Sequence, residues 1–259
     1  MTIRVEIKDH IAVVTLDNPP VNAMAADWDL PAVFDAISDN PDVHVAVLTA
    51  AGDRAFCAGA DLKGAVRASE GDAPPRRTPS GTGNRRVREM FNSIQECAVP
   101  VIGAINGPAL GGGLAIAASC DYLIASEKAK FGLPEIDVGL LGGARHFMRL
   151  LTNWGLVRRL HYTAERLDAH EAYRLGMVVK VVPHDQLMEA AMEDARLIAG
   201  KIPMGIRLAK ESLHMIENMD VKNGYRFEQT RTAILTKTED AAEARKAFVE
   251  RRPPQFKGR

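Results

Sequence analysis

Several features are scarce or missing in this sequence of 259 residues. No apolar run reaches the ~20 residues that a membrane-spanning helix needs. The first ten residues, MTIRVEIKDH, alternate polar and apolar positions and lack the pattern of a signal peptide. Lys and Arg number 33, and so do Asp and Glu, so a broad positive surface for nucleic acid is absent. We therefore expect neither a membrane nor a nucleic acid as partner.

Cysteine is also scarce, and its placement excludes several kinds of site. Cys57, Cys97 and Cys120 lie in apolar stretches without metal-ligand spacing, which favours reduced thiols in a cytoplasmic protein. Neither H-E-x-x-H, a P-loop nor a dinucleotide-binding fingerprint occurs. Ser119-Cys120-Asp121 lacks the G-x-S-x-G pattern of a nucleophile elbow. We expect no metal site and no bound cofactor.

What the sequence does contain is a globular composition with alternating strands and helices. Hydrophobic residues make up 46% of the chain, which is enough for a core. Apolar β-branched stretches predict strands or short extended segments at 3–8, 11–17, 43–49, 100–106, 122–125, 130–132 and 178–182. Apolar residues at helical spacing predict helices at 27–38, 87–96, 112–119, 143–151, 154–161 and 168–175, the last capped by Asp168.

The chain divides into an α/β core, residues 1–190, and a helical segment, residues 191–259. Near this division lies an apolar stripe formed by Leu187, Ala190, Ala191, Ala195 and Ile198. Such a stripe needs a partner, so it docks either on the core or on another subunit. Residues 64–86, rich in Pro, Gly, Ser and Arg, predict a surface loop that is either solvated or orders over a ligand.

The stretch from Asn106 to Leu140 carries the strongest signs of chemistry. Gly111, Gly112 and Gly113 open a predicted helix, and a glycine turn at a helix N-terminus aims free N–H groups at one point, which suits a negative oxygen. Glu135 follows among apolar neighbours, where burial would raise its pKa and make it a candidate acid or base. The alternatives are a simple tight turn and a solvated glutamate.

A second N–H donor is predicted in the segment FCAGADLK, at Ala60. An oxyanion is best held by donors from two directions. The two small-residue turns follow the predicted strands 43–49 and 100–106, and parallel neighbouring strands would bring both turns to one edge of a sheet. The sequence thus predicts a paired-donor site beside Glu135.

Taken together, these segments resemble the crotonase superfamily, the enoyl-CoA hydratase/isomerase proteins. The resemblance covers essentially the whole chain and rests on LDNPPVNAM, GDRAFCAGADLK, NGPALGGGLAIAASCDYLIASEKAKFGLPEIDVGL, EAYRLGMVVKVVP and AFVERRPPQFKGR. It implies an α/β fold, a spiral of repeated β-β-α units, with a C-terminal helical segment that mediates trimers, often paired into hexamers.

The resemblance also implies site residues. The backbone N–H groups of Ala60 and Gly112 would hold the thioester carbonyl of an acyl-CoA, with Glu135 as acid or base. Coenzyme A would enter as part of the substrate. The residues implied to line the substrate and its CoA are Asn22, Ala23, Ala58, Ala60, Asp61, Leu62, Lys63, Gly111, Gly112, Pro134, Gly143, Phe256 and Lys257, the last two from the same or a neighbouring subunit.

This chain departs from the hydratases of the family at position 115. They carry a second glutamate there, and this chain has Ala115, while Glu135 is present. Shifting a double bond needs one base, whereas hydration is easiest with two carboxylates. The pattern resembles the family's Δ3,Δ2-enoyl-CoA isomerases and its one-glutamate hydratase-lyases. The alternative is a non-catalytic relative that binds acyl-CoA or RNA.

A second departure lies at Leu141–His146, where the family commonly has a proline- and glycine-rich run. Arg145 and His146 either reach a polar acyl group or lie on a helix surface, and the surface position is favoured. Asp137 is a further acidic candidate. Because it lies two residues from Glu135, a structural role is favoured.

Overall fold

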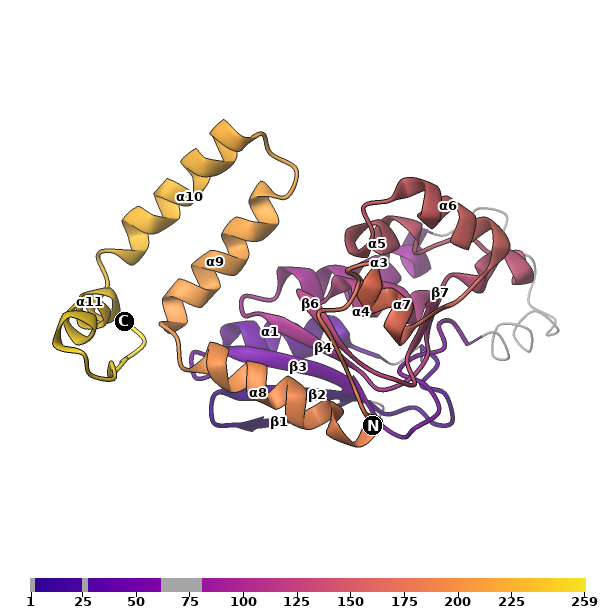
Figure 1. Ribbon diagram of the computed structural model, residues 1–259, viewed down its shortest axis with the longest axis horizontal. Coiled ribbons are helices and arrows are strands. Elements are labelled where there is room, and N and C mark those ends of the chain that lie inside the picture. Colours follow the sequence, from indigo (N-terminus) through magenta and orange to yellow (C-terminus); the bar gives the residue numbers. More distant parts are fainter. Residues whose placement is uncertain (1–2, 25–27, 62–80) are drawn as a thin grey trace.

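The computed structural model describes residues 3–24, 28–61 and 81–259. A twisted sheet forms the centre, helices cover both of its faces, and a helical arm extends from one end (Figure 1). The strands of the main sheet are β1 (Ile3–Lys8), β2 (Ile11–Leu16), β3 (Val45–Ala50), β4 (Val101–Ile105), β6 (Tyr122–Ser126) and β9 (Lys180–Val182).

The strand order in this sheet is β1-β2-β3-β4-β6-β9. β1 and β2, both predicted as strands, form an antiparallel hairpin that turns at Asp9 and His10, both with positive φ. All other neighbours are parallel. The side chains of β3 and β4 are buried on both faces, which is why these strands read as continuous apolar runs. The prediction that the strands before the two glycine-containing turns are parallel neighbours is confirmed.

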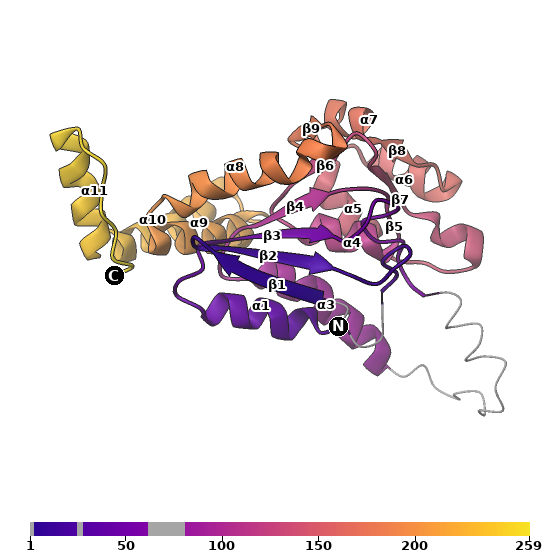
Figure 2. The same cartoon turned by 90° about the horizontal axis from the view of Figure 1, so that it is seen from below.

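One face of the sheet is covered by three helices, α1 (Leu30–Asp39), α3 (Gly81–Glu96) and α4 (Gly112–Ser119). The other face is covered by α8 (Leu187–Ala199), which follows the short 3₁₀ helix η2 (His184–Gln186). In Figure 2 the sheet lies between α8 and the pair α1 and α3. Trp28, Phe34 and Phe56 are fully buried in the core on the α1 side.

The apolar stripe near residue 190 docks on the core. Leu187, Ala190, Ala191 and Ala195 of α8 are buried against residues of β2, β3, β4 and β6, such as Val47. This settles the choice between core and second subunit for α8. The division predicted between residues 190 and 191 therefore lies inside α8, a helix that packs on the sheet.

A smaller layer stands at the carboxyl ends of the parallel strands. It contains a three-stranded sheet of order β5-β7-β8 and the surrounding helices. Its elements are β5 (Ala109–Leu110), β7 (Lys130–Gly132), the 3₁₀ helix η1 (Pro134–Val138), α5 (Ala144–Leu150), α6 (Trp154–Thr163), β8 (Leu167–Asp168) and α7 (Ala169–Arg174). Asp168 caps α7 as predicted, since its side chain accepts a hydrogen bond from the N–H of Glu171.

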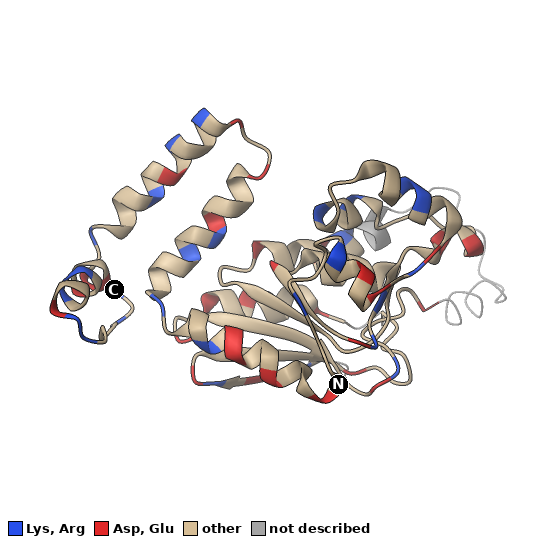
Figure 3. Cartoon of the chain, in the orientation of Figure 1, with Lys and Arg blue, Asp and Glu red and all other residues tan. Residues whose placement is uncertain are grey.

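The helical arm consists of α9 (Pro203–Ile216), α10 (Val221–Leu235) and α11 (Glu239–Glu250). α9 and α10 pack on each other, and α11 lies at the far end with the C-terminus (Figure 1). Large apolar side chains stay exposed along the arm, namely Leu213, Met215, Val221, Tyr225, Ile234, Phe248 and Val249. Figure 3 shows acidic and basic residues interleaved on the arm and the core helices, while the central strands carry almost none.

Two predicted helix starts were wrong by three residues or more. α3 begins at Gly81, not at residue 87, so the predicted loop 64–86 overlaps a helix at its end. Once the turn around Met90 and Phe91 packs on the core, each further residue adds one helical hydrogen bond, and this outweighs the low helix propensity of glycine. α1 begins at Leu30 after an Asp29 cap, three residues later than predicted. The rest of the predicted loop, residues 64–80, lies outside the described residues.

Candidate active site

Two turns meet at the carboxyl edge of the parallel strands, after β3 and after β4. Cys57 and Ala109 form a parallel bridge, and the N–H of Leu110 donates to the carbonyl of Cys57 over 3.0 Å. Gly59 has φ +88°, and a Cβ there would lie 2.9 Å from the Leu110 carbonyl oxygen and 3.2 Å from the Gly112 nitrogen. Glycine is therefore required at position 59, because the turns are in backbone contact.

The second turn ends in the N-terminus of α4. Gly111 is the N-cap and Gly112 the first helical residue, so the N–H of Gly112 has no acceptor within the helix. A Cβ at Gly113 would overlap the carbonyl oxygen of Cys57. The small residues of the glycine run therefore let a helix N-terminus sit against the first turn and present its free N–H groups and positive dipole end.

The first turn presents Ala60. Met24 and Ala60 form a parallel bridge in which the N–H of Met24 donates to the carbonyl of Gly59 over 2.8 Å. In a parallel pair one residue bonds to both neighbours of its partner, so the partner's own N–H points away from it. The N–H of Ala60 is therefore directed away from the Met24 backbone and stays available to a ligand.

Glu135 lies on η1, opposite the glycine turn. A Cβ at Gly111 would be 3.0 Å from Glu135 Oε1, and one at Gly143 would be 3.8 Å from the same atom. The Oε2 atom is buried and has no hydrogen-bond partner among the described residues. Burial raises the pKa of the Glu135 carboxyl above its usual range, against smaller lowering effects of its own backbone N–H and of His161. A half-buried carboxyl of this kind is suited to proton transfer.

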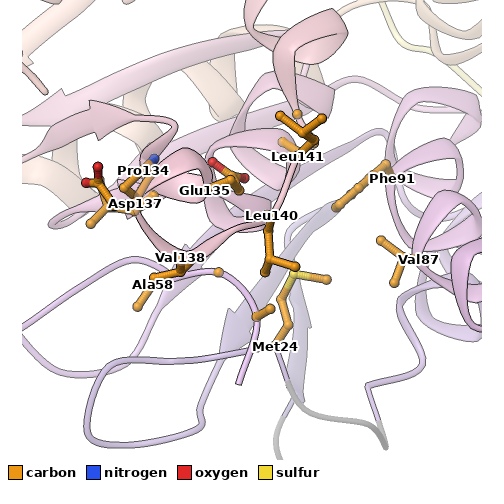
Figure 4. A pocket seen from close by; sticks show the side chains of 18 of the residues that line it. Met24, Ala58, Val87, Phe91, Pro134, Glu135, Asp137, Val138, Leu140 and Leu141 are labelled. Atoms are coloured by element: carbon orange, nitrogen blue, oxygen red, sulfur yellow. The ribbon is translucent and has the colours of Figure 1, made fainter. Parts of the chain in front are cut away.

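These groups surround one cavity of about 550 Å³ (Figure 4). Phe91 and Val87 of α3 line one side, and η1 with Glu135 lines another. Most of the lining is apolar and comprises Met24, Ala58, Val87, Phe91, Leu110, Ala115, Pro134, Val138, Leu140 and Leu141. A concave apolar cavity with a few converging polar groups is the usual form of a small-molecule site.

The structure brings half of the predicted site residues together. Ala58, Ala60, Gly111, Gly112, Pro134, Glu135 and Gly143 all line this cavity. Ala115 lines it too, on the turn of α4 after Gly112, and is fully buried. The position at which hydratases carry a second glutamate therefore faces the same space as Glu135.

Other predicted residues lie elsewhere. The side chain of Asn22 is buried and donates to the carbonyls of Ala51 and Ala55 at 2.9 Å, so it holds loops together rather than lining the cavity. Ala23 is not on the cavity wall, and its carbonyl accepts from the Asn18 side chain. Asp61 is exposed beside Ala60 but does not line the cavity. Leu62 and Lys63 lie outside the described residues.

Phe256 and Lys257 are not at this cavity within the same chain. They line a different one of about 480 Å³, together with His10, His44 and Arg207. The C-terminus lies at the arm end of the molecule, remote from η1 and α6 (Figure 1). The backbone N–H of Lys257 is bonded to Asp240 Oδ1 over 2.7 Å, which fixes the tail on α11.

The remaining candidates divide between surface and cavity. Arg145 is exposed, and the ring of His146 packs edge-on against Phe91 with centroids 4.9 Å apart; neither lines the cavity. Asp137 does line it, although its side chain is exposed and directed away from Glu135 in Figure 4. Sequence reasoning missed Arg166, a charged residue on the cavity wall. No local motif marks that residue, because the loop after α6 meets η1 only in the fold.

None of the three cysteines lines the cavity. Cys57, Cys97 and Cys120 are buried free thiols, and burial raises the pKa of Cys57 to about 12. Within the part of the chain that the structure describes, no three His, Cys, Asp or Glu residues are grouped as metal ligands would be. None of its described helices is long and apolar enough to cross a bilayer.

Comparison with known proteins places this geometry in a family. The sequence model of the enoyl-CoA hydratase/isomerase family matches residues 6–259. The chain is 40% identical over 256 residues to a (7aS)-7a-methyl-1,5-dioxo-2,3,5,6,7,7a-hexahydro-1H-indene-carboxyl-CoA hydrolase of Rhodococcus jostii (strain RHA1), which covers 95% of this chain and 93% of that protein. It is 34% identical to an (E)-benzylidenesuccinyl-CoA hydratase of Thauera aromatica over 263 residues, with all of both chains covered.

Solved structures agree with the sequence matches. The crystal structure of an enoyl-CoA hydratase from Bacillus anthracis superposes with a TM-score of 0.90 at 32% identity, covering all of both chains. The predicted crotonase fold, an α/β core followed by a C-terminal helical region, is thereby confirmed. The family description, the relatives and the shared fold agree over nearly the whole chain. The protein belongs to the enoyl-CoA hydratase/isomerase family of the crotonase superfamily.

Proposed function

We propose that this protein transforms a CoA thioester by stabilising its enolate and moving a proton with Glu135. The observation that carries the proposal is the convergence on one cavity of Ala60, the N-terminus of α4 and the Glu135 carboxyl. The N–H groups of Ala60 and Gly112 donate hydrogen bonds to the thioester oxygen as negative charge develops on it. Because that charge grows only along the reaction, these donors stabilise the transition state more than the substrate.

The single glutamate favours reactions that need one acid/base group. In double-bond isomerisation, Glu135 takes a proton from one carbon of the acyl chain, the electron pair moves toward the thioester oxygen, and the same carboxyl returns the proton to another carbon. Ala115 offers no second carboxylate to hold water. Hydration or cleavage by one glutamate is the second candidate, favoured by the hydratase and hydrolase names of the relatives.

We propose further that the acyl group is bulky and cyclic. The named substrates of the two relatives carry a fused bicyclic or a benzylidene group. Phe91, Leu140 and Leu141 supply an apolar wall, and Ala115 leaves space where the hydratases of the family carry a longer side chain. A ring buries more apolar area against such a wall than a short linear chain does.

The test is to incubate the protein with a panel of CoA thioesters and to follow each reaction by the absorbance of the conjugated thioester. The panel contains crotonyl-CoA, a linear 3-enoyl-CoA, and aromatic and bicyclic enoyl-CoA thioesters. We expect turnover of a cyclic thioester, and the class of product separates isomerase from hydratase or hydrolase. Tight binding of every thioester with no turnover of any would instead identify a non-catalytic acyl-CoA-binding relative.

We also propose assembly into a trimer or hexamer through the helical arm. The exposed apolar side chains of α10 and α11, such as Val221 and Phe248, support it, because surfaces of this kind mark protein interfaces. In the assembly, Phe256 and Lys257 reach the CoA of a neighbouring subunit, since they lie away from the cavity of their own. Light scattering should give three or six times the mass of one chain, and a monomer at micromolar concentration would refute the proposal.

A further inference from the structure

Two buried polar atoms near the cavity lack partners, and they belong to neighbouring elements. Glu135 Oε2 on η1 and His161 Nδ1 on α6 are both inaccessible to solvent and without a hydrogen bond to any described residue. α6 packs directly on η1. An unpaired buried polar atom is costly, and two on adjoining elements call for a common explanation.

The two atoms are chemically complementary. A carboxylate oxygen only accepts hydrogen bonds, and a histidine ring nitrogen that carries its proton donates one. The structure shows no direct hydrogen bond between them, and a buried water that bridged the two atoms would satisfy both. The pair thus consists of a buried acceptor on η1 and a buried donor on α6, the helix packed against it.

The two oxygens of Glu135 differ in their surroundings. Oε1 is the carboxylate atom nearest Gly111 and Gly143, and both of these residues line the cavity. Oε2 is the buried oxygen without a partner among the described residues. Glu135 lines the cavity and His161 does not.

We infer that His161 is a positioning residue for Glu135, its Nδ1–H bonded through one water to Oε2. The link holds the carboxylate in one orientation with Oε1 toward the substrate. It also favours the charged form of Glu135, the form that accepts a proton. The inference rests on the proposed role of Glu135 as acid/base.

The other charged groups near Glu135 and His161 were compared for the same role. Asp137 and Arg166 are the other ionisable side chains lining the cavity. On α6 and the loop after it, Arg159 is paired with Glu165, and Arg158 lies over the Trp154 ring. The electrostatic effect of His161 on Glu135 lowers the pKa of that carboxyl, opposing the effect of burial. Among the charged groups named here, His161 is the one with such an effect on the Glu135 pKa.

The inference is tested by titrating Glu135 itself, without any need for turnover. Infrared difference spectra of the full-length protein follow the carboxyl stretch as pH changes, and subtraction of the Glu135→Gln spectrum identifies the Glu135 band. We expect the Glu135 midpoint to rise in His161→Leu and to stay near the wild-type value in His161→Asn. The Asn amide places an N–H close to the position of Nδ1. His170→Leu, on the exposed face of α7, is the matched control and should leave the midpoint unchanged.

With a thioester that the protein turns over, the kinetics of the same variants distinguish a positioning role of His161 from a merely structural one. His161→Leu should lower kcat by about tenfold, equivalent to about 1.4 kcal/mol of barrier, with KM unchanged and the acidic limb of the pH profile moved to higher pH. His161→Asn should recover most of kcat. Equal Glu135 midpoints in wild type and a folded His161→Leu overturn the inference, even if Glu135 proves catalytic. A moved midpoint in a protein that turns over nothing leaves the link standing and removes only the proposed reaction.

Discussion

Lys210 and Glu135 are both ionisable groups held in the interior, and their surroundings differ. Lys210, on α9, is 5% exposed. Its Nζ lies 2.9 Å from Asp121 Oδ2 and donates to the carbonyls of Val99 at 2.9 Å and Ile94 at 3.3 Å. All three of its donors therefore have acceptors, and the charge joins the helical arm to the loop before β4.

Glu135 lies among apolar residues at the cavity and has a buried oxygen that finds no partner in the described part of the chain. A charge that is paired and hydrogen-bonded belongs to the structure, whereas a buried, incompletely paired group keeps the capacity to exchange protons with a ligand. The difference teaches that a buried carboxyl that is incompletely paired and lines a cavity, rather than burial alone, indicates the site. The following predictions test this contrast, starting with the largest effect.

Removing the acid/base group should abolish turnover without loss of binding. Glu135→Gln keeps the shape of the side chain but cannot take a proton, so kcat should fall by about a thousandfold. The dissociation constant of a non-reactive acyl-CoA, measured by calorimetry, should hardly change, because the carbonyl is held by backbone N–H groups. Asp137→Asn, a carboxylate change in the same cavity, is the control and should keep its activity. Equal activity in wild type and Glu135→Gln would rule out the assignment.

Removing the satisfied charge should instead affect folding. Lys210→Met removes the lysine from Asp121, which keeps its hydrogen bond from the Val101 N–H, and removes one donor from each of two carbonyls. We expect a loss of about 3 kcal/mol in the free energy of unfolding, the order found when a buried ion pair loses one partner. Denaturant unfolding measures it. Lys201→Met, an exposed lysine before α9, is the control. Adding Asp121→Asn should recover part of the loss, since the two side chains are coupled. Undiminished stability of Lys210→Met would contradict the comparison.

Adding a second carboxylate should move the cavity toward hydration. Ala115→Glu places an acid across from Glu135, one turn from the Gly112 donor, where a water can be held between the two. Hydration of crotonyl-CoA should rise at least about tenfold, or about 1.4 kcal/mol of transition-state stabilisation. Burial of the new acid should lower stability by a few kcal/mol. Ala115→Gln fills the same space without a charge and should show no gain. Efficient hydration of crotonyl-CoA by the wild type would make the one-glutamate argument wrong.

The smallest expected effect is a pH dependence of stability. The pKa of Glu135 is raised by burial above its ordinary value of 4.5, so folding binds a proton there. The stability that this group contributes is fully present below pH 4.5 and is lost as the pH rises through the raised pKa. Glu135→Gln should therefore gain stability relative to wild type as pH increases across that interval, measured by urea unfolding at several pH values.

Glu171→Gln is the matched control of opposite sign. Hydrogen bonds from Arg174 lower the pKa of Glu171, so its contribution is present above pH 4.5 and is lost as pH falls through the lowered pKa. Glu171→Gln should accordingly lose stability relative to wild type on the alkaline side. The same trend in both variants would show that burial does not control the titration of Glu135.

Much of the local structure followed from the sequence. The hairpin at Asp9 and His10, helix 112–119 and the Asp168 cap depend on residues close together in the chain. The parallel pairing of β3 and β4 was predictable because two apolar strands, each followed by a small-residue turn, read alike. The sequence failed at the start of α3, since its first residues are held by the packing of later ones.

The site divides in the same way. The sequence by itself determined that Ala60, Gly112 and Glu135 are candidate partners, because small residues and one carboxyl in apolar surroundings are visible in the chain. Only the tertiary structure decided that Ala115 and Glu135 line one cavity, that Asn22 is a buried structural amide, and that α6 with His161 packs on η1. The physical reason is that burial and hydrogen-bond satisfaction are properties of neighbours, and α6 becomes a neighbour of η1 only when the chain folds.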